Sequence, residues 1–370
     1  MRVTANQITL LRLFLLPFPV WMIYRGTRAW LLAALGVMIV LGLTDAIDGM
    51  LARRHGSTAL GALLDPIVDK IFLVASFGPL ADLRIVPSVL VVVLFVRELA
   101  VTALRSVALE EAFRFRTTRI AKLKTVVQMA GAGILLLLHM FRDGRGVSVL
   151  LGLGIVGAVA PAAVQWARGR TPGWMAWSAA ALVGPLVVLR FLFGANVVLA
   201  AVMPMIAGLT VISGAGYFWE MRGVLQARFT RRPVEAARLL AVSLVVPLVY
   251  LPLMQRPGAP IWAILLVLAA ELAIGGVDNS LVQSGIRRGP GPDLGRSAAL
   301  GVVGLALVAA TASGASPLVR HGLGGLALAI TLADLLGLLM RHGHVLLDAT
   351  ATRGSAPSAA PVGGGATRST

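Results

Sequence analysis

Residues 30–69 read WLLAALGVMIVLGLTDAIDGMLARRHGSTALGALLDPIVD. The stretch opens with an apolar run about as long as an α-helix needs to cross a bilayer, and it carries four aspartates, Asp45, Asp48, Asp65 and Asp69. An aspartate at membrane depth costs about 2.5 to 3.5 kcal/mol on insertion scales. Four of them need a compensating partner, and we expect that partner to be a divalent metal ion.

The composition is that of a polytopic membrane protein. Of the 370 residues, 58% are hydrophobic and 13% are charged, and the mean hydropathy is +0.87. Only α-helices and closed barrels satisfy the backbone inside a bilayer. The apolar runs mostly extend for about 15 to 22 residues, which is too long for barrel strands. The sequence therefore predicts an all-α polytopic membrane protein.

The formal net charge of +17 would also fit a nucleic-acid-binding protein, but its distribution favours a membrane protein. The basic residues lie in short connectors between apolar runs and do not line one soluble face, so we expect no nucleic acid partner.

The chain has no cysteine, which excludes disulfides and thiolate chemistry. By the positive-inside rule, connectors rich in Lys and Arg are expected in the cytoplasm. Five connectors meet this description, and their basic residues are Arg53 and Arg54; Arg105, Arg114, Arg116, Arg119, Lys122 and Lys124; Arg168 and Arg170; Arg231 and Arg232; and Arg287 and Arg288.

Twelve apolar runs divide into two sets of six. The first run, residues 8–24, lacks a small-residue cleavage site after it and is expected to be retained as a helix. Residues 1–170 are predicted to form a catalytic transmembrane domain, 171–345 a second transmembrane domain, and 346–370 a disordered tail of small residues. Both termini are then expected in the cytoplasm. The runs are 8–24, 30–51, 67–80, 86–104, 126–140, 147–166, 174–193, 195–219, 239–254, 261–282, 297–312 and 323–340.

Two segments of the first half resemble segments of the second. Residues 38–49 align with 205–216 once a gap of one residue is allowed, and residues 87–100 align with 260–273, which places Glu98 opposite Glu271. The aspartates have no counterpart, since Asp45 falls opposite Val211. One interpretation is a tandem duplication whose second copy has lost its site, giving an internal pseudo-dimer; the other is a chance similarity between two segments rich in Leu, Val and Ala. A homodimer is a further expectation.

The four aspartates form two pairs, each on one helical face. Asp45 and Asp48 are three residues apart, and Asp65 and Asp69 are four apart, so two neighbouring helices can bring all four together. Hard oxygen ligands in this number suit magnesium, manganese or calcium. Two such ions can neutralise a diphosphate and leave one carboxylate free to take a proton from an attacking hydroxyl, which points to phosphoryl transfer. Small residues and one cation nearby would admit the diphosphate: Gly49, Ala52 and Gly61, with Arg53.

The motif D-x-x-D-G-x-x-A-R from Asp45 to Arg53, followed by G-x-x-x-D-x-x-x-D from Gly61 to Asp69, resembles the signature of the CDP-alcohol phosphotransferase family. Seven residues separate Arg53 from Gly61, where the family usually has eight. The resemblance implies a six-helix catalytic bundle, here followed by about six more helices. It also implies that Asp45, Asp48 and Asp65 bind Mg²⁺ or Mn²⁺, that Asp69 is both ligand and general base, and that Gly49, Ala52, Arg53 and Gly61 bind the CDP group.

Within that family, residues 1–138 most resemble the phosphatidylglycerophosphate synthases. The matching pieces are NQITLLRLFLLPF, LDPIVDK, RELAVTALR and KLKTVVQ, although Ala121 stands where a glycine usually precedes the last of them. This implies transfer of a phosphatidyl group from CDP-diacylglycerol to glycerol 3-phosphate, with release of CMP. An anionic acceptor needs cations beside the metals, and Arg105, Lys122 and Lys124 are the candidates. Anionic lipid headgroups are a second expected partner of the basic cluster.

Other functions stay open. The same family includes enzymes that use other acceptors, namely phosphatidylglycerol to make cardiolipin, inositol phosphate, or serine. Twelve helices in two similar halves are also typical of transporters, although those place polar residues near the midplane, whereas these aspartates cluster at one cytoplasmic helix end. An inactive scaffold is the third alternative. Glu98 beside Arg97 is interpreted as a buried structural pair, and Glu271, Asp278 and Asn279 are interpreted as lining a vestigial cavity or pairing with Arg287 or Arg288.

Overall fold

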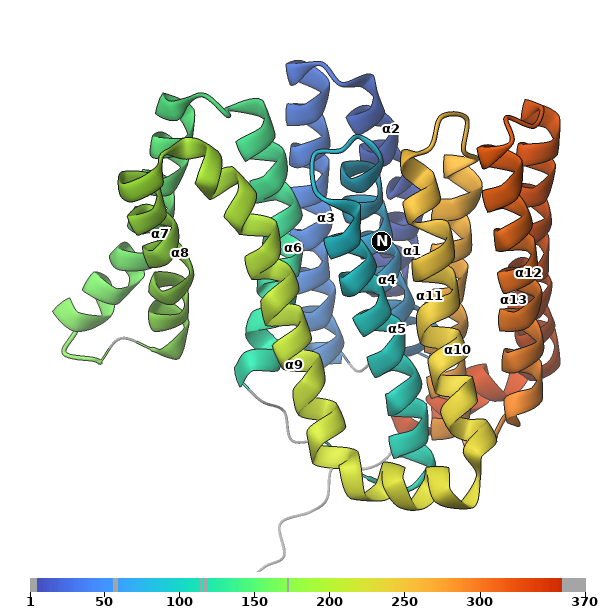
Figure 1. Ribbon diagram of the computed structural model, residues 1–370. Helices are drawn as coiled ribbons and strands as arrows, with labels where there is room; N and C mark the ends of the chain where they lie inside the picture. Colours follow the sequence, from blue (N-terminus) through green and yellow to red (C-terminus); the bar gives the residue numbers. More distant parts are fainter. Residues whose placement is uncertain (1–4, 56–58, 114, 116–118, 172, 355–370) are drawn as a thin grey trace, which may run out of the picture.

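The computed structural model describes residues 5–55, 59–113, 115, 119–171 and 173–354. The described residues form α-helices joined by short connections, with one short 3-10 helix and no strand, which confirms the predicted all-α fold (Figure 1). The first half contains α1 (Ala5–Leu15), α2 (Pro17–Arg25), α3 (Arg28–His55), α4 (Ala59–Asp82), α5 (Ser88–Glu110), α6 (Arg119–Met140) and α7 (Gly144–Ala167). The second half contains α8 (Trp174–Phe193), α9 (Ala195–Arg231), α10 (Pro233–Tyr250), the 3-10 helix η1 (Pro252–Gln255), α11 (Ile261–Gln283), α12 (Pro290–Ala312) and α13 (Pro317–Gly354).

The helices correspond one to one with the twelve apolar runs, except that the first run is split. Pro17 begins α2 directly after α1, and a proline lacks the N–H that a continuous helix would need at that point. By length and composition, seven spans within the described residues can cross a membrane. The chain is therefore an integral membrane protein.

At the carboxyl end of the described chain, α13 continues to Gly354. Residues 346–354 are therefore helical where the sequence predicted a disordered tail, because the leucines and alanines in this segment favour a helix.

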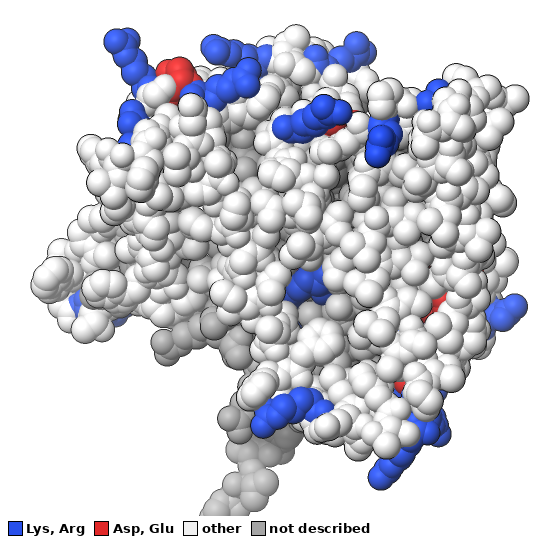
Figure 2. Space-filling model, viewed as in Figure 1, with Lys and Arg blue, Asp and Glu red and all other residues white. Residues whose placement is uncertain are grey.

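Charge is distributed as expected for a protein that spans a bilayer. Figure 2 shows Lys and Arg gathered mainly at the two ends of the molecule, with a broad and mostly uncharged band between them that a basic patch interrupts near its centre. Many large apolar side chains are exposed, among them Phe191 (84%), Leu305 (64%) and Val302 (69%). An exposed apolar surface of this extent is typical of a protein that contacts lipid or another protein. Because basic residues lie at both ends, the orientation of the chain in the membrane stays a prediction.

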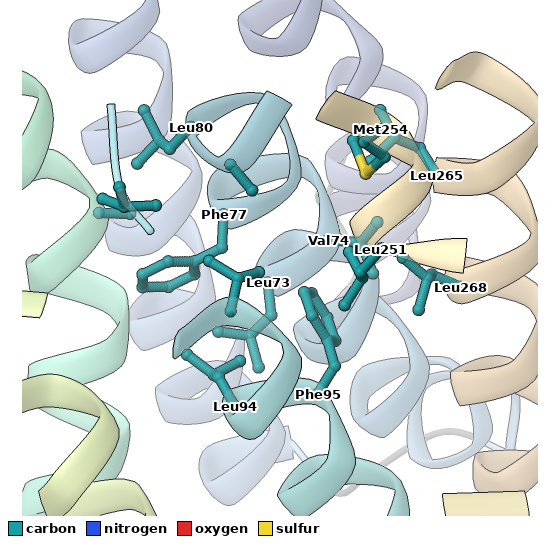
Figure 3. Packing of buried hydrophobic residues seen from close by; sticks show 14 of the residues in the cluster. Leu73, Val74, Phe77, Leu80, Leu94, Phe95, Leu251, Met254, Leu265 and Leu268 are labelled. Carbon is teal, nitrogen blue, oxygen red and sulfur yellow. The ribbon is translucent and has the colours of Figure 1, made fainter. Parts of the chain in front are cut away.

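One continuous hydrophobic core joins the two halves of the chain. Leu73, Val74 and Phe77 of α4 and Leu94 and Phe95 of α5 pack together with residues that follow α10 and with residues of α11 (Figure 3). The residues from the second half are Leu251, Met254, Leu265 and Leu268. In Figure 1, α4, α5, α10 and α11 accordingly lie side by side. The two predicted domains thus share one hydrophobic core, and the boundary between them stays a prediction.

Small residues let α11 approach α4 and α5 closely. A Cβ atom added to Gly78 of α4 would lie 2.3 Å from Cδ2 of Leu265, and one added to Gly275 of α11 would lie 2.7 Å from Cγ2 of Thr102. Helices in lipid associate through close packing of this kind, because the hydrophobic effect does not drive them together there.

We expect Gly78→Val to destabilise the contact between the halves. The added atoms have no free space beside buried Leu265, and overpacking of this kind costs about 1 to 3 kcal/mol. The midpoint of thermal unfolding in detergent is expected to fall by several degrees. Gly157→Val on α7 is the control, because a Cβ there meets no atom within 4 Å; equal midpoints for both variants would contradict the prediction.

The helices α7 and α8 form a hairpin at one side of the molecule. They pack mainly against each other (Figure 1). The next helix, α9, returns to the body and packs along α5 and α6. This 37-residue helix is about 55 Å long at 1.5 Å per residue, so it is longer than the hydrocarbon layer is thick.

Candidate active site

The signature residues lie at one end of the bundle, where α3 ends and α4 begins. Asp45 and Asp48 are in the last turns of α3, and Asp65 and Asp69 are one turn apart near the start of α4. The shared helical faces predicted from the spacing are therefore present in both helices. The side chains of Asp45 and Asp48 lie outside the described residues. The same is true of the side chains of Ala52 and Arg53, and Gly49 and Gly61 are described only as parts of α3 and α4.

Two residues of α1 hold the aspartates of α4. The Thr9 hydroxyl donates to Asp65 Oδ1 at 2.9 Å, and Arg12 Nη2 lies 3.3 Å from Asp69 Oδ1. Arg12 is buried, whereas 44% of the Asp69 side chain is exposed. Asp69 is thus held by α1 on one side, and its carboxyl group is partly exposed. Arg12 was not among the predicted site residues, although an arginine inside an apolar run is a signal of a functional site.

A buried polar group lies between α5 and α6. Glu98 Oε1 accepts hydrogen bonds from Arg97 Nη1 and Gln128 Nε2, each at 3.0 Å, and forms an ion pair with Lys124 Nζ at 2.5 Å. The buried Arg97–Glu98 pair that the sequence predicted is confirmed. The structure adds that this pair holds Lys124, one of the predicted acceptor-binding residues.

The predicted acceptor cations differ in their surroundings. Arg105 is exposed, Lys124 is largely buried beside Glu98, and the side chain of Lys122 lies outside the described residues. Lys70, next to Asp69 in the chain, is within electrostatic range of Glu98, Arg105 and Lys124 as well as of Asp69. Because α4 also packs against both α5 and α6, the fold brings Asp69 into one region with Arg105 and Lys124.

The donor set suits a hard divalent cation. Asp65 and Asp69 offer carboxylate oxygens from one helical face, and 44% of the Asp69 side chain is exposed. Magnesium and manganese prefer oxygen ligands of this kind. Among the described side chains there is no group of three or more residues that could hold a metal ion. A complete site would need Asp45 and Asp48 from α3, whose side chains are outside that set.

The acidic residues of the second half belong to a separate ionic network. Glu271 pairs with Arg296 Nε at 2.8 Å, and Asp278 pairs with Arg238 Nη2 at 2.8 Å. The described ion pairs of Glu271 and Asp278 are thus with Arg296 and Arg238, on α12 and α10, and not with Arg287 or Arg288. Asp278 does line a cavity of about 20 Å³, which has room for about one water molecule.

Comparison with known proteins shows which family the first half of the chain resembles. Residues 2–160 match the family model for CDP-alcohol phosphatidyltransferases. Over 137 residues the chain is 35% identical to the probable phosphatidylglycerophosphate synthase of Mycobacterium tuberculosis; the match covers 36% of this chain and 65% of that protein, just under two thirds of its length.

Two relatives are matched over more of their length. Both are named CDP-diacylglycerol–glycerol-3-phosphate 3-phosphatidyltransferase, and each is 30% identical to this chain. The match to the Rickettsia prowazekii protein covers 42% of this chain and 82% of that protein, and the match to the Bacillus subtilis protein covers 37% and 75%. No solved structure matches the chain significantly. The chain belongs to the CDP-alcohol phosphatidyltransferase family, which is a family of transferases.

Proposed function

We propose that the protein transfers the phosphatidyl group of CDP-diacylglycerol to glycerol 3-phosphate, giving phosphatidylglycerophosphate and CMP. The observation that carries this proposal is the packing of α4, which carries Asp65 and Asp69, against α5 and α6, which carry Arg105 and Lys124. Carboxylates suit the metal-bound diphosphate of the donor, and cations suit the phosphate of an anionic acceptor. The names of the relatives point to the same pair of substrates.

In the proposed mechanism, Asp69 takes the proton from the glycerol 3-phosphate hydroxyl as that oxygen attacks the β-phosphorus of CDP-diacylglycerol. The new P–O bond forms as the bond to CMP breaks, and the electron pair leaves with CMP. Arg12 holds Asp69 at 3.3 Å, and Lys124 and Arg105 attract the acceptor phosphate. Asp45, Asp48, Asp65 and Asp69 would hold Mg²⁺ or Mn²⁺, which neutralises the diphosphate and stabilises the departing CMP. Gly49, Ala52, Arg53 and Gly61 would receive the CDP group.

The active site is proposed to face the cytoplasm of a cell membrane, with both chain ends on that side. The ends of α3 and α5 and the starts of α4 and α6 lie at the same end of the molecule (Figure 1). Nucleotide and glycerol 3-phosphate are water-soluble anions, so they must reach this end from an aqueous compartment. The second half is proposed to be non-catalytic, and its interpretation as a degenerate copy stays a prediction.

The first test is the reaction itself. Purified protein is mixed with CDP-diacylglycerol, labelled glycerol 3-phosphate and magnesium, and CMP release and label in lipid are measured together. Label in lipid at the rate of CMP release supports the proposal. CMP release only when phosphatidylglycerol, inositol phosphate or serine replaces glycerol 3-phosphate would assign another acceptor. No turnover with any alcohol would favour a scaffold or a transporter.

Metal removal is expected to abolish the reaction. Carboxylates without a divalent ion repel the donor diphosphate, so EDTA is expected to reduce label incorporation to background. Added Mg²⁺ or Mn²⁺ is expected to restore it. Unchanged incorporation after exhaustive chelation, with metal content checked by mass spectrometry, would contradict the metal-dependent mechanism.

A further inference from the structure

The helix α9 begins beyond the residues that match the family model, which end at 160. It nevertheless packs along α5 and α6, the two helices that carry Arg105 and Lys124. Its buried face carries Thr210, Ser213 and Gly214. These residues face the buried polar group around Glu98.

The first contact is with Arg97. Its Nε donates to the backbone carbonyl of Thr210 at 3.0 Å, and its Nη2 donates to the Ser213 hydroxyl at 3.1 Å. Its Nη1 is then directed at Glu98. Gly214 provides the space, since an added Cβ would lie 2.8 Å from Cγ of Arg97 and 3.0 Å from its Nε. The guanidinium can occupy this position only because α9 has a glycine there.

The second contact passes through Gln128. Its amide donates both to Glu98 Oε1 at 3.0 Å and to the Thr210 hydroxyl at 3.3 Å. Glu98 is therefore held from two sides by groups that α9 itself holds. Since Lys124 is bonded to the same carboxylate oxygen at 2.5 Å, the position of Lys124 depends on α9.

The third contact is aromatic. The ring of Tyr217 lies 5.6 Å from the guanidinium carbon of Arg105 and 6.0 Å from that of Arg97. A cation over an aromatic face at this range is attracted to it. Tyr217 is itself packed edge-on against Phe115, with ring centroids 4.9 Å apart. The same helix thus contacts Arg105 directly and Lys124 through two intermediates.

We propose that α9 is part of the acceptor site, and that Thr210, Ser213, Gly214 and Tyr217 are positioning residues for the cations that bind the acceptor phosphate. This inference rests on the proposed function, and it gives one helix of the non-catalytic second half a role in positioning the acceptor cations. A purely structural role for α9 would affect stability and both substrates alike. A positioning role affects the affinity for the anionic acceptor, because a charge-assisted contact depends on the placement of the cation.

The test compares matched glycines and matched tyrosine variants. Gly214→Ala displaces Arg97, whereas Gly216→Ala, on the same helix, adds a Cβ that meets nothing within 4 Å. Tyr217→Leu removes the aromatic face, and Tyr217→Phe keeps it. We expect Gly214→Ala and Tyr217→Leu to raise KM for glycerol 3-phosphate about three- to thirtyfold while KM for CDP-diacylglycerol stays unchanged. Gly216→Ala and Tyr217→Phe are expected to match the wild type.

The outcomes separate the two proposals. A wild-type protein that does not label lipid from glycerol 3-phosphate overturns the proposed function. Wild-type turnover with an unchanged acceptor KM in Tyr217→Leu overturns the inference about α9 alone, as does an equal rise in both KM values. If Gly214→Ala fails to fold, as judged by size-exclusion chromatography in detergent, the Tyr217 pair decides the question.

Discussion

Asp69→Asn is expected to abolish label incorporation from glycerol 3-phosphate, with a loss of about a thousandfold or more. An amide cannot take the acceptor proton, and general base catalysis alone contributes about a hundred- to ten-thousandfold. The same substitution removes one proposed metal ligand. Arg12, which lies 3.3 Å from the carboxylate, also loses its charged partner. Label in lipid and CMP release are measured in parallel.

Asp82→Asn is the matched control for Asp69→Asn. It makes the same chemical change on the same helix, but at the opposite end of α4. Its activity is expected to stay close to that of the wild type. Activity in Asp69→Asn within tenfold of that control would remove Asp69 from the mechanism.

Arg296→Met is expected to produce the largest loss of stability. The Arg296 guanidinium is buried and contacts three carboxylates: Glu271 at 2.8 Å, Asp293 at 2.9 Å, and Asp334. Removing one member of a buried ion pair typically costs about 3 to 5 kcal/mol, because an uncompensated charge remains. Thermal unfolding in detergent, followed by tryptophan fluorescence, is expected to shift to much lower temperature.

A double variant shows whether the loss of stability in Arg296→Met comes from a buried carboxylate left without its arginine. Arg238 and Arg288 still hold Asp293 and Asp334 after the substitution, so Glu271 is the carboxylate most affected. Adding Glu271→Leu to Arg296→Met is expected to recover part of the lost stability. Arg222→Met, at an exposed position, is the control for the change of residue type. A double variant less stable than Arg296→Met would mean that Glu271 has another stabilising contact.

The sequence predicts the helices well because a bilayer permits few alternatives. Apolar runs of the length of residues 30–51 or 174–193 can only be helices when no water satisfies the backbone, and each run corresponds to a described helix. The face shared by Asp65 and Asp69 follows from helical spacing alone. The split at Pro17 and the helical residues after 345 were missed, since both depend on a few local residues and not on hydropathy.

Contacts between distant helices could not be predicted from spacing. Arg12 meets Asp69 across 57 residues, and Arg97 meets Ser213 across 116. Nothing in an apolar pattern indicates which helix of a bundle lies beside which. The pairing of Asp278 with Arg238 was missed for the same reason, because the nearest arginines in sequence were Arg287 and Arg288.

The place of α9 in the bundle has a consequence for biosynthesis. The Arg97–Glu98 pair enters the membrane with α5, but Ser213 and Thr210 are synthesised more than a hundred residues later. At about 5 to 20 residues per second, the Arg97–Glu98 pair therefore lacks its contacts with Thr210 and Ser213 for on the order of ten seconds. During that time water, lipid headgroups or the insertion machinery must satisfy the guanidinium. A ribosome stalled inside the α7–α8 hairpin would therefore leave a nascent chain in which Arg97 and Glu98 lack the α9 contacts of the folded protein.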